Sequence, residues 1–118
     1  MAEKRDRTTE ENIELEAEAA CLETEGVACM TLLTYDMIAE SILRKNQSRG
    51  IKLSKNGDGY NIDVYAEVYF GCRIPETAWN IQENVKQRVE ANTSAKVNKV
   101  NIHIEGVRPQ EEKTNAQN

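Results

Sequence analysis

Apolar and polar residues alternate along two stretches of the chain, and this spacing predicts two β-strands with a helix between them. The strands run from Tyr60 to Phe70 and from Val97 to Glu105, because a period of two places successive side chains on opposite faces of a sheet. The helix is predicted from Pro75, which suits a first helical turn, to Asn92, where a polar break begins. Together these elements form a compact β-α-β core.

The same patterns predict which side chains face the core. In the first strand we expect one face to carry Tyr60, Ile62, Val64, Ala66, Val68 and Phe70. The opposite face then carries Asn61, Asp63, Tyr65, Glu67 and Tyr69. The helix is expected to bury Ala78, Ile81, Val85 and Val89, and the last strand Val100, Ile102 and Ile104. Such a sheet has one face under helices and one face toward water or a partner.

Apolar residues with a helical period mark two further segments in the N-terminal half. One predicted helix covers Asn12–Glu23 and ends at Gly26. A second follows Thr34, a residue type favoured at helix N-caps, and spaces its apolar residues over Tyr35–Leu43. The apolar run Val27–Leu33 between the helices is interpreted as a short strand.

A β-hairpin is predicted where Ile51–Lys55 alternates and Asn56–Gly57 supplies residues that tolerate the positive φ of a tight turn. The resulting order, α-β-α-β-β-α-β, predicts an α+β two-layer sandwich with helices on one face of a small, mostly antiparallel sheet. The helical crossover from Phe70 to Val97 allows two arrangements. The strands before and after it either pair directly in parallel or have another strand between them. The sequence therefore leaves the strand order open.

Length and composition predict a single domain. The chain has 118 residues, of which 39% are hydrophobic, enough for one modest core. We expect the domain to cover residues 12–107, with a flexible acidic segment over 1–11 and a flexible tail over 108–118. No apolar run long enough for a membrane span or a secretory signal is present, which predicts a cytosolic (cytoplasmic) protein.

The net charge of −5 is concentrated near the N-terminus. Residues 1–25 carry 3 Lys/Arg and 9 Asp/Glu, whereas residues 26–106 carry 10 and 9. A nearly neutral core argues against nucleic-acid binding, which normally needs a basic surface. The alternative hypothesis is a small nucleic-acid-binding module that uses Lys86, Arg88, Lys96 and Lys99.

Residues with catalytic or metal-binding potential are few and scattered. His103 is the only histidine; it would need a neighbouring ligand or carboxylate, and Asp63 or Glu67 reaches it only if their strands are adjacent. Cys72 lies at a strand-to-helix junction, but no catalytic partner is evident. The three cysteines lack the close pairs of zinc sites. We therefore expect no enzyme activity, cofactor or metal.

Aromatic residues placed off the predicted core indicate binding instead. Tyr65 and Tyr69 share the outward face of the long strand with Glu67, and Trp79 lies beside the buried line of its helix. Trp and Tyr often dominate the energy of protein interfaces. Tyr65, Glu67, Tyr69 and Trp79 are therefore the candidate interaction residues.

Two runs of residues resemble the alkaline shock protein family, cytosolic proteins of Gram-positive bacteria linked to cell-envelope stress. They are Tyr69-Phe70-Gly71-Cys72-Arg73-Ile74-Pro75-Glu76 and Ile81-Gln82-Glu83-Asn84-Val85. The resemblance implies a non-enzymatic scaffold that forms homo-oligomers or is recruited by a small membrane-anchored partner. It implies no catalytic residues, and Thr77 departs from it because an aliphatic residue is usual at that position.

Overall fold

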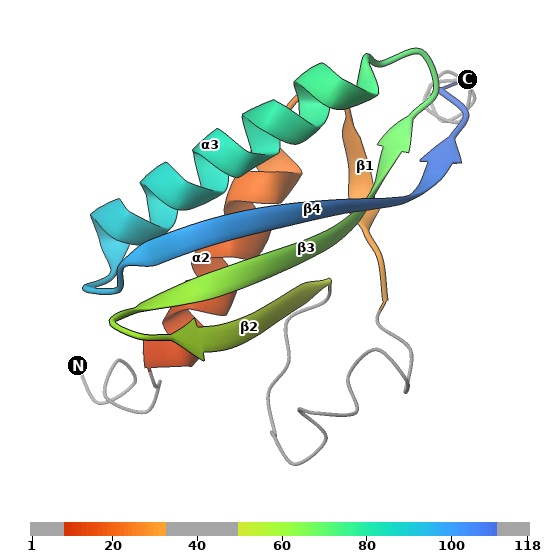
Figure 1. Cartoon of the computed structure of the whole chain (residues 1–118). Coiled ribbons are helices and arrows are strands. Elements are labelled where there is room, and N and C mark those ends of the chain that lie inside the picture. The colour runs from red at the N-terminus through yellow and green to blue at the C-terminus, as the bar shows by residue number, and fades with distance from the viewer. Residues whose placement is uncertain (1–8, 33–49, 111–118) are drawn as a thin grey trace, which may run out of the picture.

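The computed structural model describes residues 9–32 and 50–110, which form two helices and one four-stranded sheet (Figure 1). Along the chain the elements are α2 (Thr9–Glu23), β1 (Val27–Met30), β2 (Ile51–Asn56), β3 (Gly59–Tyr69), α3 (Ile74–Asn92) and β4 (Val97–Arg108). The predicted α+β two-layer architecture is confirmed. The helix predicted over Tyr35–Leu43 lies outside the described residues.

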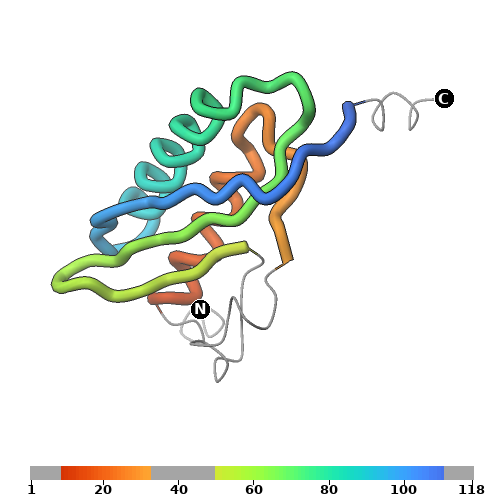
Figure 2. The backbone as a smooth tube through the Cα atoms, turned by 45° about the vertical axis from the view of Figure 1, so that its right-hand side comes forward, coloured from red at the N-terminus to blue at the C-terminus, as the bar shows by residue number. Residues whose placement is uncertain are grey.

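β3 is the central strand of the sheet. β4 pairs with it in parallel along one edge, while β1 and β2 pair with it antiparallel along the other. The sheet is thus mostly antiparallel, as predicted, and α3 is the crossover that makes the β3–β4 pairing parallel. Both helices lie on the same side of the sheet (Figures 1 and 2). The other face is open in the described part of the chain.

β1 and β2 occupy the same edge of β3 one after the other. β1 pairs with the C-terminal part of β3 and β2 with its N-terminal part. They meet at Tyr65, whose carbonyl accepts a hydrogen bond from the Thr31 amide (2.9 Å) and whose amide donates to the Gly50 carbonyl (2.7 Å). The chain therefore leaves this edge and returns to it at the same residue of β3.

The core lies between the helices and the inner face of β3. The inward positions of β3 are buried from Tyr60 to Val68, as the alternation predicts. Phe70 was expected to join them, and that prediction is wrong, because its side chain is 73% exposed. The inner face ends with β3 at Tyr69, and the chain then turns away at Gly71, whose φ is +100°.

The helix and β4 each differ from the prediction at one position. α3 buries Thr77 instead of Ala78, together with Ile81, Val85 and Val89, so its contact line follows steps of four residues. In β4, Val100 is buried and Ile102 packs against the core. Ile104 was expected in the core but stays half-exposed, because the burial of β4 decreases along the strand from Val100 to Val107, which is 51% exposed.

The hairpin turn is shifted by one residue from its predicted position. Asn56 pairs with Gly59, so Gly57 and Asp58 form the two-residue loop. Only Gly57 has a positive φ there, +63°. A glycine with positive φ at the first loop position is typical of a type II′ turn.

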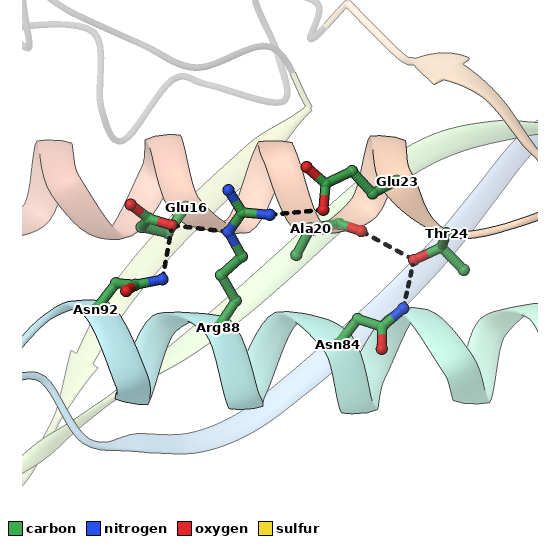
Figure 3. A network of polar contacts seen from close by, with 7 residues as sticks. All are labelled: Glu16, Ala20, Glu23, Thr24, Asn84, Arg88 and Asn92. Carbon is green, nitrogen blue, oxygen red and sulfur yellow. Dashed lines mark hydrogen bonds and ion pairs between the residues drawn. The ribbon is translucent and has the colours of Figure 1, made fainter.

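Polar side chains join the two helices (Figure 3). Arg88 of α3 donates to Glu16 (2.9 Å) and Glu23 (2.6 Å) of α2. Hydrogen bonding to Glu16, and then to Glu23, raises the pKa of Arg88. Asn84 donates to the Thr24 hydroxyl at 2.9 Å. These contacts fix how α2 lies along α3.

The buried thiol of Cys21 predicts a pH dependence of stability. Burial, and then the nearby Glu18 carboxylate, raises the pKa of Cys21 from 9.0 to about 12. The thiol ionises more easily in the unfolded chain, so its stabilising contribution is complete below pH 9 and falls as the pH rises toward 12. The loss is about 1.4 kcal/mol per pH unit in this window.

Urea unfolding of the wild type and Cys21→Ala across this window tests that prediction. The variant should start less stable at neutral pH, because it removes a buried side chain, and should then lose stability less steeply than the wild type above pH 9. Other titrating groups are common to both proteins and cancel in the comparison. Parallel curves would contradict the prediction.

Candidate functional site on the open face of the sheet

The outward side chains of β3 and β4 form a continuous polar and aromatic surface, here called the open face. The parallel register sets Asp63 beside Asn101 and Tyr65 beside His103. Two of the candidate interaction residues, Tyr65 and Glu67, lie on this face and are half-exposed. The face is thus built from two strands that are far apart in sequence.

Asp63 holds the centre of the open face together. Its Oδ1 accepts a hydrogen bond from the Asn101 amide at 3.1 Å and lies 3.0 Å from His103 Nε2. The rings of Tyr65 and His103 are stacked, with centroids 4.3 Å apart and planes 8° from parallel. Burial, and then the carboxylates of Asp63 and Glu105, raises the pKa of Tyr65. The phenol therefore stays protonated as a hydrogen-bond donor.

Glu67 links the three strands β1, β3 and β4 on the same face. Its Oε1 accepts a hydrogen bond from Arg108 Nε at 2.7 Å. The Cys29 thiol of β1 lies 3.8 Å from the same oxygen. Arg108 is the last residue of β4, one residue beyond the predicted end of the domain, so its contact with Glu67 could not be predicted from the pattern.

Tyr69 and Trp79 lie away from the centre of the open face. Tyr69 lines a hollow of about 670 Å³ at one end of the molecule, together with Cys72 and Arg73. This hollow is called the end hollow below. Trp79 projects from α3 and is 58% exposed. The four candidate interaction residues therefore do not form one cluster.

The basic residues of the alternative hypothesis are also divided between surfaces. Arg88 is engaged by two glutamates of α2. Lys86 is exposed on α3, whereas Lys99 belongs to β4 beside Asn61. The Arg88 contacts have no signal in the sequence pattern, because the two glutamates are 72 and 65 residues away along the chain.

Among the described residues, the side chains of the open face do not include a set of converging reactive groups. His103 meets a carboxylate there, but Cys72 lines the end hollow instead. Within residues 9–32 and 50–110, no group of three metal-ligating side chains is present. In the same ranges, no helix has the length and apolar character needed to cross a membrane.

A comparison with known families identifies the family of this chain. Residues 3–109 match the alkaline shock protein 23 family. This family is described as having a cell envelope-related function. The chain belongs to the alkaline shock protein family. This confirms the resemblance that the two sequence runs indicated.

Relatives of this alkaline shock family protein occur in Gram-positive bacteria. Protein YqhY of Bacillus subtilis (strain 168) is 39% identical over 97 residues, which cover 82% of this chain and 72% of YqhY. Protein YloU of the same organism is 37% identical over 73 residues, 62% of this chain and 61% of YloU. The match to YloU thus spans less than two thirds of that relative.

Solved structures show a similar fold at low sequence identity. The structure titled MamM CTD M250L superimposes with a TM-score of 0.50 and 14% identity, over 84% of this chain and 99% of that one. MamM CTD C267S gives the same TM-score and identity. At this level of identity the similarity concerns the fold.

Proposed function

We propose that this alkaline shock family protein is a non-enzymatic, cytosolic interaction and scaffolding protein that supports the cell envelope. It acts by self-association or by recruitment to a membrane-anchored partner. The observation that supports the proposal is the open face, where His103 contacts Asp63 and stacks on Tyr65, with Glu67 on the same face. The family's cell envelope-related function supplies the cellular context.

A fixed surface of this kind is suited to binding a macromolecule. The rings of Tyr65 and His103 stack on one another, and a contact of this kind reduces the side-chain entropy that is lost when a partner binds. Tyrosine also combines a large apolar surface with a hydroxyl donor, a combination frequent at interface centres. The half-exposed Glu67 carboxylate adds a charged contact next to it.

The edge of β4 that faces away from β3 is a less suitable interaction site than the open face, because side chains of α3 already bond to its backbone. The Val97 amide donates to the Glu90 carboxylate at 3.0 Å, and the Val100 carbonyl accepts a hydrogen bond from the Gln82 amide at 3.0 Å. Both partners belong to α3. Two register shifts in β4 further limit regular pairing. Native proteins protect edge strands in these ways.

Light scattering over a range of concentrations tests the proposal. We expect a mass that rises with concentration for the wild type and association about tenfold weaker for Tyr65→Ala, because the variant removes a preordered aromatic contact. Trp79→Ala is the matched control, since it removes an exposed aromatic residue from the helical layer and should leave the assembly unchanged. The nucleic-acid alternative predicts instead that nucleic acid copurifies and is lost steeply with added salt.

A protein that remains monomeric at every concentration and retains no protein partner on isolation from its native cell would contradict the proposal. Equal effects of Tyr65→Ala and Trp79→Ala would contradict the assignment to the open face. Far-UV circular dichroism of both variants shows whether either change disturbs the fold.

A further inference from the structure

The side of α2 that faces away from the core carries an apolar stripe. Leu15 and Leu22 are two helical turns apart and are 42% and 46% exposed, with Ala19 between them. The core-facing side of the same helix buries Ile13 and Ala17. α2 therefore has two apolar sides, and within residues 9–32 and 50–110 only one of them packs against other elements. The stripe of Leu15, Ala19 and Leu22 is called the outer stripe.

The outer stripe lies in strongly negative surroundings. α2 contains six glutamates and no lysine or arginine over Thr9–Glu23. Arg88 engages Glu16 and Glu23 on the side that faces α3, while Glu18 lies on the opposite flank of the stripe. The C-terminal end of a helix also carries negative partial charge, and the last turn of α2 has no basic residue to offset it.

The end hollow continues this surface beyond the last turn of α2. Leu22 lines both the stripe and the hollow, where Glu25 and Glu76 add two exposed carboxylates. Among the described residues that line it, Arg73 is the only basic one. An apolar strip along a helix thus runs into a concave, mainly acidic recess of about 670 Å³.

The charge of this surface determines which partner it fits. A second copy of α2 would bring glutamates against glutamates, and like charges across an interface are costly. A segment rich in lysine or arginine would gain from the same carboxylates, and its apolar side would remove Leu15 and Leu22 from water. Helices with these two sides bind in this way along apolar grooves.

We propose that the outer stripe and the end hollow dock a basic amphipathic helix of a partner protein. The apolar side of that helix covers Leu15 and Leu22, and its cationic groups approach Glu18, Glu25 and the C-terminal end of α2. Because α2 and the centre of the open face lie on opposite sides of the sheet, this binding leaves Asp63, Tyr65 and His103 uncovered. The protein would then hold two partners at once.

Fluorescence anisotropy with the full chain and a labelled peptide tests this inference. The probe is a peptide of about 18 leucines and lysines with leucines at helical spacing, at about 0.15 M salt. We expect saturable binding that weakens about tenfold in the double variant Leu15→Gln/Leu22→Gln. Glu18→Gln/Glu25→Gln should weaken binding and reduce its dependence on salt.

Three controls distinguish docking from nonspecific attraction. A peptide of the same composition with scrambled leucines should bind about tenfold more weakly, and Trp79→Gln and Tyr65→Ala should leave binding unchanged. Both leucines are half-exposed, so the double variant should keep the wild-type melting temperature. Absence of saturable binding, equal binding of the scrambled peptide, or a leucine double variant that changes the oligomeric mass instead would overturn the inference.

Discussion

Replacing Gly50 with alanine is expected to destabilise the domain by about 3 kcal/mol. Gly50 has a φ of +73°, which L-residues adopt at a cost, and an added Cβ would lie 2.5 Å from the Tyr65 carbonyl oxygen and 2.9 Å from Met30 Cε. The first of these neighbours is backbone of the central strand and cannot move without shifting β3. Urea unfolding followed by circular dichroism measures the loss.

Gly57→Ala is the matched control for this prediction. Gly57 also has a positive φ, +63°, but nothing lies within 4 Å of an added Cβ. Only the backbone strain remains, and the expected cost is about 1 kcal/mol. Equal losses at the two positions would show that the close contact at Gly50 is unimportant.

A second large effect is expected for Ile62→Ala, which should cost about 3 kcal/mol. Ile62 is completely buried in the middle of β3 and belongs to the core shared by both helices. Truncation removes apolar contacts on the central strand and leaves a cavity that its packed neighbours can fill only in part. Denaturant unfolding of the variant against the wild type gives the difference directly.

The variant Phe70→Ala tests whether Phe70 is buried, as the alternation pattern predicts, or exposed, as in the structure. The pattern places Phe70 on the same side as Ile62 and would predict a comparable loss. The structure leaves this ring 73% exposed, so we expect a change below about 0.5 kcal/mol. A loss close to that of Ile62→Ala would mean that Phe70 packs in the core after all.

Local patterns were sufficient for most of the described fold. The alternation over residues 60–68 matches the burial of every inward position of β3, and Pro75 and Asn92 lie near the two ends of α3. The wrong predictions concern positions where the sequence pattern continues beyond the end of a strand or does not determine the rotation of a helix. Phe70 follows the last residue of β3. In α3, Thr77 is buried instead of Ala78, because the rotation of a helix about its axis is set by packing against other elements.

The candidate site was harder to predict, because it depends on which strands are neighbours. Tyr65 and Glu67 were selected from their outward positions alone. The contact between Asp63 and His103 was foreseen only for the case that β3 and β4 are adjacent, and the parallel register provides that condition. Arg108 gave no signal, since it follows the apolar alternation and precedes a proline.

The meeting of Thr31 and Gly50 at Tyr65 makes one residue of the central strand common to two pairings. Thr31 follows β1 and Gly50 precedes β2, and both bond to the Tyr65 backbone. A substitution that shifts this backbone should therefore disturb the registers of β1 and β2 together. The two short strands are thus coupled through β3 and should separate from it as one cooperative unit.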